Sequence, residues 1–410
     1  MSSANSFVEV LDRDSVADVL FDHASPATMY RIGWTCWMAR RAVQDYSRRT
    51  FNINRHLRRF FDDPIGFRNL QAQTGTLISG AFAHGFLDRT LRDEACLDLY
   101  IYSQHALEVG LWVMQNGGKV YRFKRIHGQH PDFDSAVNAV VKGLYWPRDV
   151  QGDDGFETYH LGWYQNLLKF ATHEEEPALA VRIFVSQYAP LKSLIEHNWH
   201  STAFMNVISF YAAYSSHPFA TFEKKTSLAF RFQGEEPFKI DQQMGYDVIN
   251  SVQDLEKNPS KSFEVGRPRH LDDALSWVLP FDMRGISWPK LSPGNHHLSF
   301  DPCSLNSWSF IKRYFSRGTR IGTHHWQIKD EIFKFQYCYA EMDKDLRRII
   351  EGHLKMERAK QWIFPNQERR TWHDEVLFDY KMGSLKTESL ACRLLGIFGG
   401  RLSSRWHTSA

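Results

Sequence analysis

The stretch at residues 76–102, TLISGAFAHGFLDRTLRDEACLDLYIY, decides the fold class that the sequence predicts. A short apolar segment favours a strand that ends at Gly80, and residues 81–87 predict a helix turned back against that strand. After a charged loop, the apolar residues of 97–102 alternate with Asp98 and two tyrosines, which is the pattern of a half-buried strand. The stretch therefore predicts a strand, a glycine turn, a helix and an aspartate-bearing strand.

This order of elements suits the transfer of a nucleotide. Such chemistry needs backbone amides at a helix N-terminus to hold phosphate oxygens, and Ser79, Gly80 and Ala81 occupy that position here. It also needs two carboxylates at i and i+2 on one strand, because that spacing places both on one face to grip a pair of Mg²⁺ ions. Asp98 is the candidate metal ligand and catalytic carboxylate.

These residues resemble a family of uncharacterised basidiomycete proteins with a polymerase-β-type nucleotidyltransferase fold. The matching residues are 79–80, 86–90 and 97–100, then 190–191, Ile195, 200–209 and 220–223. The resemblance implies an α+β fold in which helices flank a mixed sheet. It also implies Mg²⁺ as a cofactor if the chain is catalytically active; otherwise the cofactor is unknown.

The sequence departs from that family at the positions that carry the chemistry. Cys96 stands where the first carboxylate of the strand pair belongs, and Mg²⁺ is a hard cation that prefers oxygen to sulfur. Ala81 lacks the hydroxyl of a Gly-Ser turn, and Arg182 stands where a third carboxylate is expected. Asp98 alone cannot assemble two Mg²⁺ ions, so the metal site is predicted to be degenerate. Arg182 could instead pair with Asp98 and hold the site shut.

Each candidate also has a purely structural interpretation. Asp98 could lie on the exposed face of an edge strand, or pair with Arg89 or Arg92. Gly80 could serve a tight turn, and Cys96 could be a small residue beside the core.

Other side chains could in principle complete a site. Residues 93–94 and 174–176 are acidic runs just ahead of two predicted strands, which is typical of solvated charge. The adjacent histidine pairs at 296–297 and 324–325 point apart, so they suit joint metal ligation poorly. Residues 200–202, His-Ser-Thr, resemble a helix N-cap more than a nucleophile.

The N-terminal region is predicted to be helical from about residue 15 to 61. Ser25 and Pro26 suit the cap and first turn of a helix, and residues 24–51 resemble a degenerate F-box. That resemblance implies docking on the small adaptor of SCF-type ubiquitin ligases. The alternative is a helical cap on the neighbouring domain.

The remaining pattern divides the chain into four regions. Branched residues at 178–185 predict a strand, residues 190–213 predict a helical segment, and residues 328–362 predict a long amphipathic helix or pair. A stretch rich in Pro, Gly, Ser and His at 289–302 predicts a linker. The expected regions are 1–62 (helical, F-box-like), 63–235 (nucleotidyltransferase-like core), 236–300 (irregular connection) and 301–410 (largely helical).

Bulk composition limits the class of protein. The 410 residues include 43% hydrophobic residues, and 50 basic against 47 acidic residues give a net charge of +3. That balance indicates neither a nucleic-acid coat nor a membrane-surface protein. Five scattered cysteines without a CxxC pair favour a reducing compartment, and neither a signal peptide nor a membrane span is expected. The expected location is cytoplasmic or nuclear.

Three functions follow as hypotheses. The first is a degenerate nucleotidyltransferase-fold protein without catalysis, acting as a binding or regulatory module for a nucleotide or a protein partner. The second is an active metal-dependent nucleotidyltransferase that uses Asp98. The third is an F-box-type substrate adaptor. The enzyme question stays open and leans towards no catalysis.

Overall fold

The structure is a computed structural model. It describes residues 14–91, 96–115, 119–124, 132–142, 167–172, 179–230, 236–257, 261–291, 297–315, 318–340, 350–352 and 372–383.

The N-terminal region is helical, as predicted. Its helices are α2 (Asp14–His23), α3 (Pro26–Gly33), α4 (Trp37–Thr50), α5 (Ile53–Leu57) and α6 (Pro64–Thr74). The predicted cap is confirmed, because the Ser25 hydroxyl accepts the Thr28 backbone N–H and Pro26 opens α3. Phe21 and Met29 are buried in the same hydrophobic cluster as the central sheet, so these helices are anchored to the body of the protein.

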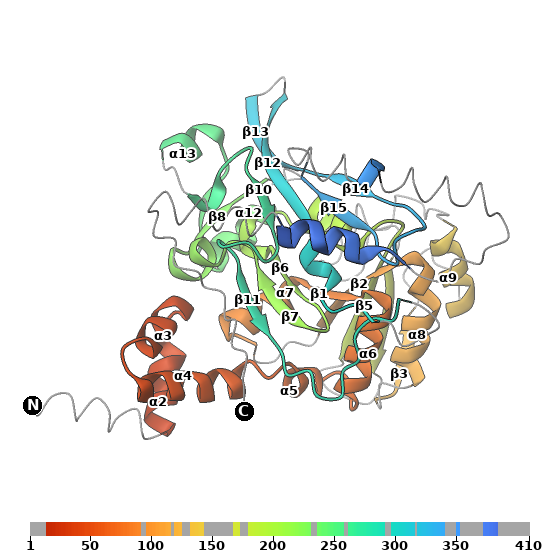
Figure 1. Ribbon diagram of the computed structural model, residues 1–410, viewed down its shortest axis with the longest axis horizontal. Helices are drawn as coiled ribbons and strands as arrows, with labels where there is room; N and C mark the ends of the chain where they lie inside the picture. The colour runs from red at the N-terminus through yellow and green to blue at the C-terminus, as the bar shows by residue number, and fades with distance from the viewer. Residues whose placement is uncertain are drawn as a thin grey trace, which may run out of the picture.

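An eight-stranded mixed sheet forms the centre of the molecule, in the order β11-β7-β6-β1-β2-β5-β4-β3 (Figure 1). Its strands are β1 (Leu77–Ser79), β2 (Cys96–Tyr102), β3 (Tyr121–Lys124), β4 (Leu167–Thr172), β5 (Ala180–Ser186), β6 (Asn206–Ile208), β7 (Ala212–Ser215) and β11 (Trp277–Pro280). Strands β2 and β5 run parallel, whereas the other neighbours in this order pair antiparallel. The predicted α+β class with a mixed sheet and flanking helices is confirmed.

The predicted strand, turn, helix and strand are also confirmed as β1, Gly80, α7 (Gly80–Asp88) and β2. However, β2 lies between β1 and β5 rather than at an edge. The prediction of a half-buried strand is wrong, because Asp98, Tyr100 and Tyr102 on its second face are at most 8% exposed. Both faces of β2 are therefore covered.

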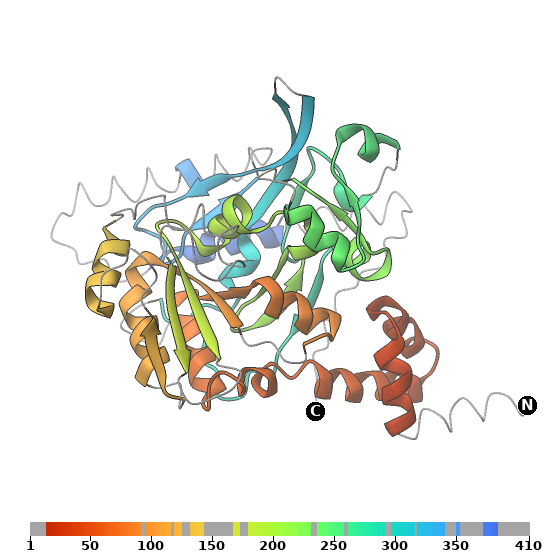
Figure 2. The same cartoon turned by 180° about the vertical axis from the view of Figure 1, so that it is seen from behind.

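The two faces carry different layers. Leu97, Leu99 and Ile101 share a buried cluster with α6, α7, α8 (Ala106–Gln115) and α9 (Phe133–Val141). Tyr100 and Tyr102 share another with residues of the C-terminal half. The central sheet thus separates a helical layer from a C-terminal layer, as the view from behind also shows (Figure 2).

The prediction of one helical segment at residues 190–213 is wrong. Helix α11 (Pro190–Ser193) and a π-helical turn, η2 (Leu194–Asn198), are followed by strands β6 and β7. Short apolar runs fit a buried strand and a buried helix equally well by period, so the local pattern could not separate them.

The region at 236–300 is more than a connection. It contains the short elements α12 (Glu236–Gln243), β9 (Asp247–Ile249), α13 (Val252–Lys257), β10 (Pro268–His270) and β11. The last of these pairs with β7 at the edge of the central sheet. The predicted linker at 289–302 holds the buried side chains of Leu291, Leu298 and Phe300, because its composition excludes regular structure but not burial.

The prediction of a largely helical C-terminal region is wrong over residues 307–339. Strands β12 (Ser307–Phe315), β13 (Gly318–His324), β14 (Trp326–Ile328) and β15 (Tyr337–Tyr339) occupy it. Its aromatic and β-branched residues favour strands, and here they outweigh the helical spacing. Residues 350–352 and 374–383 are helical, while 341–349 and 353–371 lie outside the described residues. Two small sheets, β10-β12-β13 and β14-β15, belong to this layer, and β8 (Thr226–Leu228) pairs with β9.

Candidate functional site

The junction of β1 and α7 requires a glycine. Gly80 has φ +73°, in the left-handed region that favours glycine, and a Cβ at this position would lie 2.8 Å from Asp98 Oδ2. The carboxylate of Asp98 therefore sits against the start of α7, where Ala81 is exposed to solvent.

The Ser79 hydroxyl is used inside the protein. It donates to the Asn206 carbonyl at 2.6 Å and accepts the Trp199 indole N–H at 3.1 Å. Because the Ser79 side chain is buried, the predicted phosphate position reduces to the backbone around Gly80 and Ala81.

Asp98 and Arg182 form a two-pronged ion pair. They are directly opposite one another on the parallel strands β2 and β5. Arg182 Nε donates to Asp98 Oδ1 at 2.6 Å, and its terminal Nη2 donates to Oδ2 at 2.8 Å. The side chains are 11% and 22% exposed for Asp98 and Arg182. Both carboxylate oxygens are therefore bound by one guanidinium, which is the strongest common geometry for such a pair.

The pKa of Arg182 agrees with this geometry. Burial alone would lower that pKa, but attraction and hydrogen bonding to Asp98 outweigh burial and raise it above its ordinary value. Arg182 is thus held as a cation beside the carboxylate.

Two of the alternative interpretations of Asp98, a place on an edge strand and a pair with Arg89, are wrong. The residue lies on a central strand, and Arg89 instead donates to the carbonyls of Phe21 and Ala24. Arg92 lies outside the described residues.

Cys96 is half-buried, and its sulfur lies 3.8 Å from Asp98 Oδ1. In that contact the thiol is a weak donor to a carboxylate that Arg182 already binds. A protonated thiol in this role is not a ligand for Mg²⁺.

Basic residues follow Arg182 along the line of directly opposed residues that starts at Asp98 and crosses the sheet. Lys169 on β4 is directly opposite Arg182, and Lys124 on β3 is directly opposite Lys169. Residues paired in this way point to the same face of a sheet. One carboxylate thus shares its face and level with three basic residues, an arrangement that repels divalent cations.

The part of the candidate site that the structure describes does not fit Mg²⁺. Among the described residues, no group of three or more His, Cys, Asp or Glu side chains could hold a metal ion. The acidic runs at 93–94 and 174–176 lie outside that part of the chain.

The histidine candidates have separate surroundings. His297 Nδ1 lies 2.9 Å from the Trp288 carbonyl, and His325 Nε2 lies 3.3 Å from Glu196. His296 lies outside the described residues.

The His-Ser-Thr segment is structural. His200 pairs with the buried Asp241 at 2.9 Å, and Thr202 Oγ1 accepts the Leu228 backbone N–H at 2.9 Å. Ser201 precedes a short 3-10 helix (Thr202–Phe204), but its hydroxyl makes neither a capping hydrogen bond nor one to His200, so no activated serine results.

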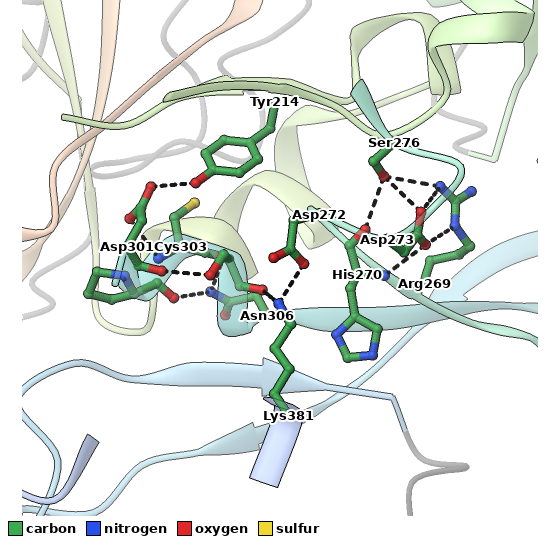
Figure 3. Close-up of polar contacts among 12 residues, drawn as sticks. Tyr214, Arg269, His270, Asp272, Asp273, Ser276, Asp301, Cys303, Asn306 and Lys381 are labelled. Atoms are coloured by element: carbon green, nitrogen blue, oxygen red, sulfur yellow. Dashed lines mark hydrogen bonds and ion pairs between the residues drawn. The ribbon is translucent and has the colours of Figure 1, made fainter. Parts of the chain in front are cut away.

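A second polar region lies between the central sheet and the C-terminal layer, shown in Figure 3. Tyr214 donates to Asp301 at 2.7 Å, and burial raises the pKa of the Asp301 carboxyl. Asp301 and Tyr102 line a cavity of about 30 Å³ at the far end of β2 from Asp98. That volume holds about two water molecules, so the cavity is too small for a nucleotide.

Sequence reasoning missed the groups that surround the candidate site. Trp199 and Asn206 fix Ser79, while Lys169 and Lys124 extend the cationic row. Strand register places the lysines in line with Asp98 across β5, β4 and β3, and one sequence holds no signal for register across distant strands.

Among the described helices, none is long and apolar enough to cross a membrane. Comparisons with protein-family models, with curated proteins and with solved structures give no match to this chain, so its function has to be argued from its own residues.

Proposed function

We propose that this chain is a degenerate nucleotidyltransferase-fold protein that acts as a binding or regulatory module rather than as a catalyst. One observation carries the proposal: both oxygens of Asp98, the carboxylate expected to bind metal, are occupied by Arg182. The fold assignment is supported by β1, Gly80, α7 and β2 in the expected order, and by position 182 lying opposite position 98.

Arginine can replace the metal structurally but not chemically. A metal ion in such a site polarises a phosphoryl oxygen and activates the attacking group. The guanidinium supplies one fixed positive charge and hydrogen bonds, and it cannot accept a proton. If this chain were an active nucleotidyltransferase, it would have to break the pair of Asp98 and Arg182. It would then have to bind Mg²⁺ on a face of the sheet that also carries Lys169 and Lys124.

Restoring the carboxylates tests the proposal. The double variant Cys96→Asp, Arg182→Asp places three carboxylates on one face, so we expect it to gain Mn²⁺ binding at least tenfold tighter than the wild type. Isothermal titration calorimetry measures this gain, and thermal melting confirms that the variant is folded.

The matched control is the triple variant that adds Asp98→Asn, which should lose the gained affinity. Tight Mn²⁺ binding by the wild-type chain that disappears in Asp98→Asn would overturn the proposal. So would incorporation of a labelled nucleotide that depends on Asp98.

A second candidate, the F-box-type adaptor, is favoured by a different observation. Helices α2 and α4 and the turn between α3 and α4 expose large apolar side chains: Val19 is 59% exposed, Trp34 65% and Trp37 70%. Exposed aromatic residues of this kind are typical anchors of protein interfaces. Behind them, Glu223 accepts from Ser25 and from the Ala27 backbone, which holds α3 on the body.

Point variants test this candidate better than deletion, since removing residues 1–62 would also remove buried core residues such as Phe21. If the adaptor function is correct, the purified small SCF adaptor binds the full chain, and Trp34→Ala with Trp37→Ala weakens binding at least tenfold. The control is Trp326→Ala, an exposed tryptophan on β14 that should leave binding unchanged. An intact chain that does not bind the adaptor in a calorimeter would remove the candidate.

A further inference from the structure

Only one half of the β12–β13 hairpin is packed against the body of the protein. Near its base, Trp308 and Phe310 are fully buried in the C-terminal cluster. Its other end projects away from the body in both views (Figures 1 and 2), and Tyr314 there is 80% exposed. Because the core does not need this outer half, its residues are available to contact a partner.

The chain around the hairpin has a charge unlike that of the whole protein. Residues 302–329 contain no Asp or Glu, whereas they contain five Lys and Arg residues: Lys312, Arg313, Arg317, Arg320 and Lys329. Lys312 pairs with Glu256 at 2.7 Å, but both side chains are exposed, so that pair weakens the local field little. The near-neutral total of +3 therefore conceals a local concentration of positive charge.

Two arginines of the hairpin face one another. Arg313 on β12 is directly opposite Arg320 on β13. Like charges at directly opposed positions of an antiparallel pair repel one another and destabilise it. Directly opposed residues point to the same face of the hairpin, so one anion could contact both arginines.

Arg313 is also ordered in advance. Its terminal nitrogen donates to the Thr323 carbonyl at 2.7 Å. Its stem lies across Gly322, where a Cβ would come within 2.7 Å of Arg313 Nε. Because Gly322 has no side chain, there is room for the Arg313 guanidinium at this position. The guanidinium has further N–H donors that can bind an anion.

Tyr314 adds an exposed aromatic face next to these charges. Successive residues of a strand alternate between faces, so Tyr314 lies on the opposite side of the ribbon from Arg313. Adjacent strands are only about 4.8 Å apart, so a thin ribbon of two strands offers both faces to one flexible chain. Basic side chains that hold phosphates and an aromatic ring on which a base stacks are together typical of sites for single-stranded nucleic acid.

We infer that the outer half of the β12–β13 hairpin binds single-stranded nucleic acid, with Arg313 and Arg320 on phosphates and Tyr314 stacked on a base. An acidic peptide could pair with the arginines, but it has no nucleobase on which Tyr314 could stack. A duplex buries its base faces within the helix. This inference is independent of the proposed function, because it uses no residue of the Asp98 site.

The test is fluorescence anisotropy with the full chain and a labelled twelve-nucleotide single strand, as RNA and as DNA, at two salt concentrations. We expect binding that Arg313→Ala with Arg320→Ala weakens at least tenfold, with a salt dependence reduced by about 1.4 in log–log slope for two lost phosphate contacts. Tyr314→Ala should weaken binding by about tenfold with an unchanged salt slope, since stacking is not electrostatic.

Two comparisons make the result specific. The double variant Arg48→Ala, Arg49→Ala removes two arginines from α4, far from the hairpin in sequence, and should leave affinity unchanged. Tyr314→Phe keeps the ring and should bind as the wild type does. The inference is overturned if the single strand does not bind, if a duplex of the same sequence or a poly-glutamate peptide binds as tightly, or if the α4 variant weakens binding equally.

Discussion

Replacing Arg182 with methionine is expected to lower the free energy of unfolding by about 3 kcal/mol, at the lower end of the range for breaking a buried ion pair. Methionine keeps most of the aliphatic stem but leaves Asp98 without the guanidinium that binds both of its oxygens. The lower end applies because Arg182 retains 22% side-chain exposure, through which water partly replaces the lost contact. Urea denaturation of the single variant measures the loss.

The double variant Asp98→Asn, Arg182→Met identifies the cause. Because it removes both charges, it should recover most of the stability that Arg182→Met loses. The control is Arg48→Met, which breaks an exposed pair with Asp45 and should change stability by less than about 1 kcal/mol. If Arg182→Met were as mild as Arg48→Met, Asp98 would be solvated without its partner, and Arg182 would not be what holds the site shut.

The local part of the fold could be predicted because short-range rules determine it. The turn at Gly80 has φ +73°, and a glycine between a predicted strand and a predicted helix indicates such a turn. The sequence could predict the pairing of Asp98 with Arg182 as one possibility, because that prediction needs only the relative register of two clearly patterned strands.

The rest of the sheet depends on contacts between segments far apart in the sequence. β1 pairs with β6 through Ile78 and Ile208, and β11 at residues 277–280 closes the edge beside β7. The local sequence pattern of β1 or of β11 does not indicate which strand it pairs with. The second face of β2 is a further example, because Tyr102 is buried by a C-terminal layer that includes Phe335. Alternation of polar and apolar residues could not reveal that cover.

The C-terminal layer also limits the directions from which a ligand could reach Asp98. It covers the far end of the face that carries Asp98, and the cavity left there is about 30 Å³. A nucleotide bound at this site would therefore have to enter beside Gly80 and Ala81, at the start of α7, where Ala81 is exposed.

Arg269 joins the small sheet β10-β12-β13 to the central sheet through buried contacts. Replacing it with methionine is expected to lower the free energy of unfolding by about 4 kcal/mol. The residue lies on β10 and is 2% exposed (Figure 3). It binds both oxygens of Asp273, and it donates to the Ser216 carbonyl just after β7 of the central sheet. Burial alone would raise the pKa of Asp273, but attraction to Arg269 outweighs it, so the pKa is lowered.

Methionine at position 269 would leave the Asp273 carboxylate, whose side chain is only 19% exposed, without its cation, and the Ser216 carbonyl without this donor. Both costs add to the lost pair, which is why the effect should exceed that of Arg182→Met. Arg267, two residues earlier, pairs with Glu264 while both are about half exposed, so Arg267→Met should cost less than about 1 kcal/mol. Urea denaturation compares the two variants, and hydrogen exchange should show β12 and β13 losing protection before the central sheet does. Equal costs at positions 267 and 269 would mean that the sheets are held together by apolar packing alone, with Arg269 dispensable.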